Sequence, residues 1–319
     1  MASTIGDLGE FGLIAEVTHG LVMPPEVVVG PGDDCAVFAP RGQVVVTTDA
    51  MHEDVHFKKV WSGPHDVGRK AVASAVADVE AMGARPLGLV VALSAPADTP
   101  AEWVLEFSRG VRAECEASGA ALMGGDTTRS GAISVVVTVF GDLEGRTPVL
   151  RSGARPGDVV AYIGRLGMAA AGLAVLGRGF RSPGAVVRSH RVPEPPYGQG
   201  IVAQEAGATS MVDCSDGPLA DLGHIAKASG VSIDLDSSAL DVDEAQKTVA
   251  AAIGGGDPLN YILTGGDDHA LLATFTSASE VPDGWAVIGR VGESDPEAEA
   301  SVTVDGKAWS TDAGGWRHF

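Results

Sequence analysis

The sequence predicts a mixed α/β protein with two domains. At 319 residues, the chain is longer than one hydrophobic core usually serves, and a hydrophobic content of 45% is enough to build two cores. Runs of β-branched residues alternate with segments whose apolar residues recur at the helical period. Between the two halves, a stretch rich in glycine, proline and charge interrupts both patterns.

The runs of β-branched residues are bounded by turn residues, as is typical of strands. They predict strands at residues 44–48, 87–93, 133–140, 159–163, 210–212 and 231–235. Helices are predicted between them at residues 67–82, 101–118, 168–177, 200–206, 218–229 and 243–253.

The helix predicted at residues 67–82 has a clear apolar face. The residues that share this face are Val72, Ala75, Val76, Val79 and Met82. Lys70, Ser74 and Asp78 fall on the opposite flank. We therefore expect Asp78 to be available to a site.

Residues 141–158 are dense in glycine, proline and charge, so we place the domain boundary there. The predicted domains are residues 1–145 and 146–319. Aspartate-rich motifs occur in both halves, which predicts a ligand cleft shared between the domains.

The net charge of −20 and the isoelectric point near 4.6 argue against nucleic acid or an anionic membrane as a partner, because both would be repelled. A phosphate substrate would be repelled as well, unless bound cations reverse the local field. Simple solubility is the alternative explanation for most of this charge.

Cys35, Cys115 and Cys214 lack the spacing of a zinc site or a disulfide framework, so we expect free thiols. The first ten residues have neither a basic start nor an apolar core, and the apolar run at residues 87–95 is too short to span a bilayer. These features predict a cytoplasmic protein.

Aspartates recur beside glycine or at strand ends along the whole chain. The motifs are Gly32-Asp33-Asp34, Thr47-Thr48-Asp49, Gly124-Gly125-Asp126-Thr127-Thr128, Asp213-Cys214-Ser215-Asp216-Gly217 and Gly265-Gly266-Asp267-Asp268. Carboxylate oxygens suit hard cations such as Mg²⁺, and glycine allows close backbone approach to a ligand. This pattern predicts a polyphosphate site with several metal ions. The sequence lacks a Walker loop, a Rossmann fingerprint and the catalytic loop of protein kinases.

These motifs, in this order, resemble the thiamine-monophosphate kinases, which belong to a wider group with aminoimidazole ribonucleotide synthetase and selenophosphate synthetase. The resemblance runs nearly end to end. It also includes Gly9-Glu10-Phe11, Val55-His56-Phe57, Ala77-Asp78, Ala81-Met82-Gly83-Ala84, Arg151-Ser152-Gly153-Ala154 and the terminal Gly315-Trp316 with His318-Phe319.

The resemblance implies the two-domain fold of that group and transfer of the γ-phosphoryl group of ATP to thiamine monophosphate, with Mg²⁺ as cofactor. It also implies a homodimer, formed by pairing of the amino-terminal sheets. The amino-terminal domain would bind ATP and Mg²⁺, and the carboxyl-terminal domain would complete the cleft. A phosphate acceptor is already anionic, so such a transfer needs alignment and charge neutralisation and no general base.

The resemblance also implies roles for individual residues. The expected metal ligands are Asp33, Thr47, Thr48, Asp49, Asp78, Asp126, Asp213 and Asp216. The expected nucleotide contacts are Gly125, Asp126, Arg151 and Ser215, and the expected thiamine phosphate contacts are His56, Asp267 and Trp316.

Each residue also has a structural interpretation. Asp33 and Asp34 can shape the turn after Pro31, and Asp78 can be a solvent-facing helix residue. Asp216 can serve the following helix, with Gly217 as cap and Pro218 at the first helical position. The remaining alternatives are a linker charge for Arg151, a surface loop for His56, a turn cap for Ser215 and terminal packing for Trp316.

The chain departs from the family pattern in its last motif. Where the family typically has Gly-Gly-Glu-Asp-Tyr-Glu, this chain reads Gly265-Gly266-Asp267-Asp268-His269-Ala270. Asp54 stands where glycine is common, and Pro218 where leucine is common.

The sequence leaves two other functions open. One is a different ATP-dependent reaction of the wider group, although the chain lacks the amino-terminal cysteine of selenophosphate synthetases and the cysteine-bearing tail of the hydrogenase-maturation relatives. The other is a non-catalytic binder of thiamine phosphate or nucleotide.

Overall fold

The computed structural model describes residues 3–253, 256–294 and 301–309. The chain divides into two compact units. Unit 1 comprises residues 1–79 and 84–146, and unit 2 comprises residues 80–83 and 147–319. None of the described helices is long and apolar enough to cross a membrane.

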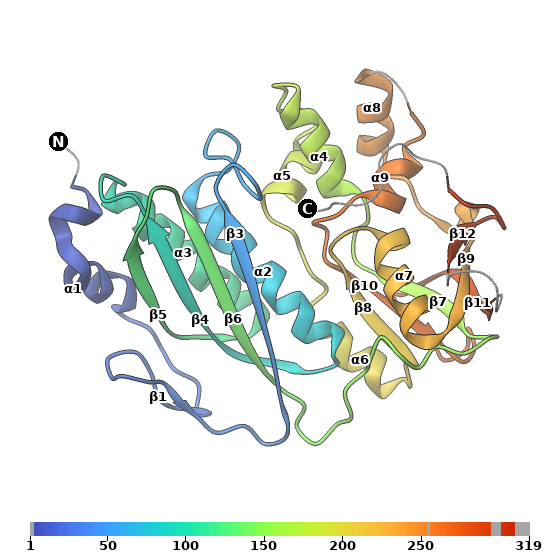
Figure 1. Cartoon of the computed structure of the whole chain (residues 1–319), viewed down its shortest axis with the longest axis horizontal. Coiled ribbons are helices and arrows are strands. Elements are labelled where there is room, and N and C mark those ends of the chain that lie inside the picture. The colour runs from blue at the N-terminus through green and yellow to red at the C-terminus, as the bar shows by residue number, and fades with distance from the viewer. Residues whose placement is uncertain (1–2, 254–255, 295–300, 310–319) are drawn as a thin grey trace. The chain divides into compact units, whose positions relative to one another are not determined.

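Unit 1 contains a four-stranded sheet of order β3-β6-β4-β5, in which only the β4–β5 pair is parallel. Figure 1 shows α2 and α3 on one side of this sheet. In chain order, the elements are α1 (Ile5–Thr18), β1 (Val27–Val29), β2 (Val37–Phe38), β3 (Val44–His52), α2 (Pro64–Ala81), β4 (Arg85–Ala95), α3 (Ala101–Ser118), β5 (Ala121–Arg129) and β6 (Ser134–Asp142).

Unit 2 contains a six-stranded sheet of order β12-β9-β11-β7-β10-β8, in which β12 pairs parallel with β9 and the other pairs are antiparallel. Its strands are β7 (Val159–Ile163), β8 (Ser210–Cys214), β9 (Val231–Leu235), β10 (Ala270–Phe275), β11 (Ala286–Glu293) and β12 (Val302–Val304). Its helices are α4 (Met168–Gly177), α5 (Gly184–Arg191), α6 (Gln199–Glu205), α7 (Pro218–Ser229), the short 3₁₀ helix η1 (Ser237–Ala239), α8 (Glu244–Ala252) and α9 (Leu259–Thr264).

The structure confirms the mixed α/β class. Helices α3, α4 and α7 and strands β7 and β9 have the bounds that the sequence predicts. The prediction for α2 is partly wrong: Lys70 and Ser74, expected on a polar flank, are only 2% and 7% exposed. The helix is therefore buried on nearly all sides. Asp78 is half-buried, so it is not a solvent-facing helix residue.

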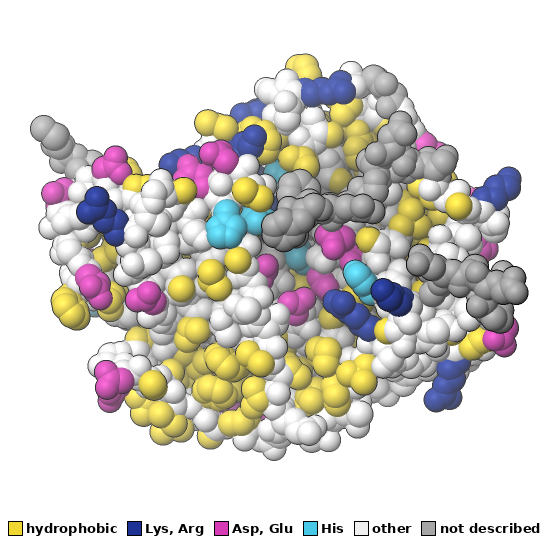
Figure 2. Space-filling view, viewed as in Figure 1, with side chains coloured by type: hydrophobic (Ala, Val, Ile, Leu, Met, Phe, Trp, Pro, Cys, Tyr) yellow, Lys and Arg dark blue, Asp and Glu magenta, His cyan; other side chains and the backbone are white. Residues whose placement is uncertain are grey.

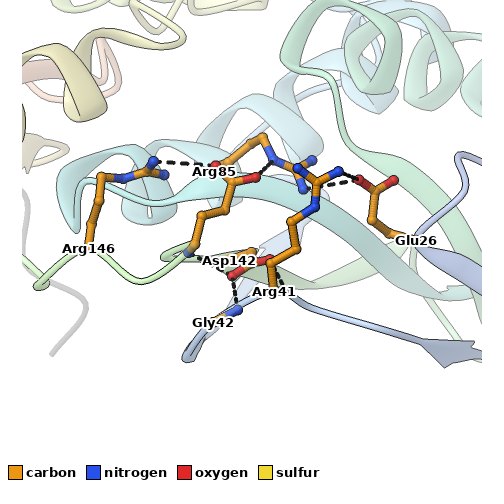
Figure 3. A network of polar contacts seen from close by, with 7 residues as sticks. Glu26, Arg41, Gly42, Arg85, Asp142 and Arg146 are labelled. Carbon is orange, nitrogen blue, oxygen red and sulfur yellow. Dashed lines mark hydrogen bonds and ion pairs between the residues drawn. The ribbon is translucent and has the colours of Figure 1, made fainter.

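A polar network fixes the start of β3 and the end of β6 (Figure 3). The Asp142 carboxylate accepts hydrogen bonds from the backbone N–H groups of Arg41, Gly42 and Glu144 at 2.6, 3.0 and 2.8 Å. Because Asp142 is fully buried, these bonds are needed to offset its lost hydration. They hold the turn before β3 in place, and β3 carries the Thr47-Thr48-Asp49 motif.

Candidate functional site

The described part of unit 1 has a pocket of about 880 Å³ with an apolar floor and an acidic rim. The floor comes from α1, α3, β2 and strands of the four-stranded sheet, and includes Phe38, Val90 and Phe140. The predicted site residues Asp33, Asp34, Gly125 and Asp126 also line it. The size lies within the range of small-molecule sites. Such a pocket can take an aromatic group on its floor and cation-bound phosphates at its rim.

Strand β5 places Gly125 and Asp126 in this pocket. The glycine-rich motif lies within the strand, where Gly125 pairs with Val91 and Asp126 pairs with Ala92. A Cβ atom on Gly125 would lie 2.0 Å from the Val91 carbonyl oxygen, so this close strand contact requires glycine. The Asp126 side chain next to it is exposed. The sequence did not predict β5 (Ala121–Arg129), the strand that contains this motif.

The turn at residues 31–35 holds the acidic pair before β2. The Asp33 carboxylate accepts a hydrogen bond from the Asp34 backbone N–H at 2.8 Å, so Asp33 shapes its own turn. Both side chains are exposed. The turn-forming role and a ligand role are therefore compatible.

Strand β3 and helix α2 bring another group of predicted ligands together. The Thr47 hydroxyl donates a hydrogen bond to Asp78 Oδ2 at 2.6 Å. Thr48 points to the opposite face of the sheet, where its hydroxyl lies 3.1 Å from that of Thr138. One ion therefore cannot bind both threonine hydroxyls. Across the sheet, the pairing of β3, β6, β4 and β5 places Asp49 level with Gly125.

His56 lies in the connection that follows β3. Its Nδ1 atom accepts a hydrogen bond from the His52 backbone N–H at 3.1 Å, which fixes the orientation of the ring. The buried Lys70 ammonium lies 3.4 Å from the His56 carbonyl oxygen, to which it donates. Asp54 adopts a φ of 65°, the left-handed region that favours glycine. This conformation explains why glycine is common there in the family.

In unit 2, the segments that follow β8 and precede β10 are joined through their backbones. The Asp267 N–H donates to the Ser215 carbonyl oxygen, and the His269 N–H donates to that of Cys214, both at 2.9 Å. A Cβ atom on Gly266 would lie 2.2 Å from the Ser215 oxygen, so the contact depends on glycine. The structure therefore brings the Asp213–Gly217 motif and the Gly265–Asp268 motif together.

Two buried acids in this region are bound to helix starts. Asp221 Oδ2 accepts hydrogen bonds from the backbone N–H groups of Asp216 and Gly217 at 3.0 and 2.9 Å. Asp268 Oδ1 accepts one from Ala169 at the start of α4, at 2.9 Å. Sequence reasoning missed the role of Asp221, which lies four residues after the Gly217 N-cap. The expected Gly217 cap and Pro218 at the first helical position are confirmed.

Burial and crowding of negative charge raise the pKa values of both acids. Burial is the main cause for each, and raises the pKa of Asp268 to about 7. Burial followed by the charge of Asp213 raises the pKa of Asp221 to about 7, and Asp216 adds to the effect. A bound cation would relieve this repulsion. Hard oxygen donors at high charge density fit Mg²⁺, in this region and in unit 1.

The carboxylates of Asp216 and Asp221 lie close to a ring nitrogen of His224, with ligand atoms of the three residues within 4.8 Å of one another. His224 was not predicted. His224 lies three residues after Asp221 on α7, so both side chains lie on one face of the helix. This spacing is visible in the sequence and could have indicated that the two side chains lie together.

Arg151 and Ser215, the other predicted nucleotide contacts of unit 2, lie in different segments of this unit. Arg151 has an exposed side chain, and its carbonyl oxygen accepts a hydrogen bond from the Ser229 hydroxyl. Ser215 is half-buried and directly follows β8. Trp316 lies outside the described residues.

Comparisons with known proteins identify the group to which these motifs belong. Residues 32–143 match the family "AIR synthase related protein, N-terminal domain", and residues 155–300 match "AIR synthase related protein, C-terminal domain". The chain is 48% identical over 317 residues to the thiamine-monophosphate kinase of Mycobacterium tuberculosis, covering 99% of this chain and 93% of that protein. It is 40% identical to the enzyme of the same name from Corynebacterium glutamicum, covering 99% of this chain and 95% of that protein.

Solved structures give the same result. A structure of AaThiL complexed with AMPPCP and TMP is 31% identical, with a TM-score of 0.77 and full coverage of both chains. The thiamine-monophosphate kinase of Stenotrophomonas maltophilia is 32% identical, with a TM-score of 0.78 and coverage of 93% and 95%. Hydrogenase maturation protein HypE from E. coli, at 21% identity and a TM-score of 0.70, shares the fold. The chain therefore belongs to the thiamine-monophosphate kinase family, as the order of its motifs predicts.

Proposed function

We propose that this chain transfers the γ-phosphoryl group of ATP to thiamine monophosphate, giving thiamine diphosphate and ADP. The observation that carries this function is the nearly full-length similarity to thiamine-monophosphate kinases, together with the aspartate motifs in both units. The site geometry agrees, because it offers carboxylates, hydroxyls and an apolar pocket. The proposed reaction does not require a protein nucleophile.

The chemistry requires one bond to form and one to break. An oxygen of the thiamine phosphate attacks the γ-phosphorus, and the bond from that phosphorus to the bridging oxygen of ADP breaks. The acceptor is already deprotonated near neutral pH, so no side chain has to remove a proton. The protein aligns the two anions and offsets their charge.

We assign Mg²⁺ to the carboxylates, where it would neutralise phosphate charge. In unit 1, the proposed ligands are Asp33, Thr47, Thr48, Asp49, Asp78 and Asp126. In unit 2, they are Asp213 and Asp216. The support is the oxygen-rich donor set, together with the ligand atoms of Asp216, Asp221 and His224 that lie within 4.8 Å of one another.

The substrate contacts follow the same reasoning. We assign the nucleotide to Gly125, Asp126, Arg151 and Ser215, where the Arg151 guanidinium suits phosphate recognition. His56, Asp267 and Trp316 are assigned to thiamine monophosphate. In this assignment, residues 1–145 bind ATP and Mg²⁺, and residues 146–319 complete the cleft. The cytoplasmic location stays a prediction.

We also propose a homodimer that forms through the sheet of unit 1. Val44 and Val46 on β3 are 41% and 63% exposed, and Figure 2 shows hydrophobic side chains gathered over this sheet. Large exposed apolar surfaces usually mark interfaces. Val46→Glu should shift the mass measured by light scattering from dimer to monomer, whereas Val22→Glu, at an exposed position outside the sheet, should not. A wild-type monomer would contradict the proposal.

The function is tested by a mass-resolved assay of purified protein with ATP, Mg²⁺ and thiamine monophosphate. Controls contain thiamine or no acceptor. Equal amounts of ADP and thiamine diphosphate, formed only with the monophosphate, would support the kinase. ADP formation with another acceptor would replace the substrate assignment.

The second candidate is a binding protein without turnover. It is favoured by one observation, the departure from the family pattern at Asp267–Ala270. It predicts that nucleotide and thiamine monophosphate bind without ADP formation at any Mg²⁺ concentration, which the same assay detects.

A further inference from the structure

His269 and Asp213 form a buried pair in unit 2. His269 Nδ1 lies 3.2 Å from Asp213 Oδ2, and the two side chains are 7% and 5% exposed. A carboxylate oxygen accepts a hydrogen bond from an imidazole N–H, so this geometry fits the tautomer in which Nδ1 carries the hydrogen and donates it to Asp213. The pair therefore fixes both the tautomer of the imidazole and the orientation of the carboxylate.

The backbone holds this histidine rigidly against Asp213. The His269 N–H donates to the carbonyl oxygen of Cys214, the residue after Asp213. Two residues further on, Leu271 of β10 pairs with Asp213 of β8. His269 has a φ of 55°, and histidine is one of the few residue types enriched in this left-handed region. Backbone and side chain thus both fit histidine at this position.

We propose that His269 is a positioning residue, which holds Asp213 Oδ2 through Nδ1–H and so presents Oδ1 to a divalent cation. This inference rests on the proposed function, in which Asp213 is a Mg²⁺ ligand. It assigns a role to the position where this chain departs from the tyrosine of the family pattern. Groups that hydrogen-bond metal ligands from behind orient them, and their loss typically weakens metal binding by about 10- to 100-fold.

Two substitutions separate the hydrogen bond from the backbone conformation. His269→Asn keeps an N–H donor on the atom bonded to Cγ, where Nδ1 stands in histidine. His269→Gly removes the donor. Asparagine and glycine both tolerate a positive φ, so the two variants differ mainly in the donor.

The measurement is binding of Mn²⁺ by electron paramagnetic resonance, in the presence of a non-hydrolysable ATP analogue. His269→Gly should weaken Mn²⁺ binding by about 10-fold or more, and His269→Asn should restore most of the loss. Thermal unfolding of each variant controls for folding. If His269→Gly does not fold, His269→Gln takes its place, because it moves the amide one bond further from Cγ. Equal Mn²⁺ affinity of the wild type and the donor-removed variant would overturn the proposal. A loss of Mn²⁺ affinity in His269→Asn as large as that in His269→Gly would also overturn it.

A second readout needs neither metal nor substrate. The nitrogen-15 NMR spectrum of the His269 imidazole in the metal-free protein should show a hydrogen on Nδ1. A neutral ring protonated only on Nε2 would overturn the proposal. Because both readouts are independent of turnover, a protein that fails to phosphorylate thiamine monophosphate but shows both effects would contradict only the proposed function.

Discussion

The acidic residues around the pocket of unit 1 and those beside β8 and β10 of unit 2 are held in different ways. In unit 1, Asp33, Asp34 and Asp126 are exposed around an open pocket. In unit 2, Asp221 and Asp268 are 2% and 4% exposed and bind backbone N–H groups at helix starts. Acids of the first kind can bind a ligand at little cost to the fold. Acids of the second kind stabilise the fold, and their charges are costly in the absence of a cation.

The largest effect should come from Asp126→Asn. We expect kcat/KM to fall by about 100-fold or more, which corresponds to a loss of about 3 kcal/mol of transition-state stabilisation. The unfolding temperature should stay unchanged, because the side chain is exposed. Steady-state kinetics over a range of Mg²⁺ concentrations test this, and Mg²⁺ should rescue activity at most in part. Near-normal activity would remove Asp126 from the metal set.

Asp268→Ala should show the opposite pattern, with a stability loss of about 2 to 3 kcal/mol. The substitution leaves the Ala169 N–H without its acceptor in a buried position. Asp34→Ala is the matched control and should change stability by less than about 0.5 kcal/mol, because Asp34 is exposed. Urea unfolding of both variants decides the point. Equal losses of stability in the two variants would contradict the distinction between these two groups of acids.

The raised pKa of Asp268 predicts that the metal-free protein loses stability as the pH rises. Folding raises this pKa from 3.8 to about 7, so between these values the folded state keeps a proton that the unfolded state releases. Stability should fall by on the order of 2 kcal/mol between about pH 5 and about pH 7 from this group alone.

Asp268→Asn should remove this part of the pH dependence, because its amide does not titrate. Urea midpoints at the two pH values measure the difference. If the stability of the variant falls with pH as steeply as that of the wild type, other groups cause the pH dependence.

The smallest effect should come from Asp54→Gly, which relieves the strain of a non-glycine residue in a left-handed backbone conformation in unit 1. We expect stabilisation of about 0.5 kcal/mol, and destabilisation by Asp54→Ala, since alanine tolerates this φ less well than aspartate. Melting temperatures of the two variants should move in opposite directions. Movement in the same direction would point to a side-chain role for Asp54.

Sequence reasoning predicted the fold class well, because long periodic segments such as 101–118 and 218–229 have strong patterns and clear ends. It failed where a functional motif overrode local propensity. It did not predict β5, because glycine is unfavourable in strands, yet Gly124 and Gly125 pair with Val90 and Val91 of β4. The pairing of His269 with Asp213 depends on a contact between distant segments, which periodicity does not encode. The role of Asp221 is local, but the sequence pattern does not show that its carboxylate turns back to the backbone of Asp216 and Gly217.

The most direct test of the central claim follows the transferred group itself. ATP labelled with ¹⁸O at the three non-bridging γ-oxygens is incubated with the protein, Mg²⁺ and thiamine monophosphate, and the products are resolved by ³¹P resonance. Direct transfer predicts thiamine diphosphate whose terminal phosphorus carries all three labels, with unlabelled ADP in equal amount. Label found only in inorganic phosphate, or thiamine monophosphate left unchanged, would contradict the account.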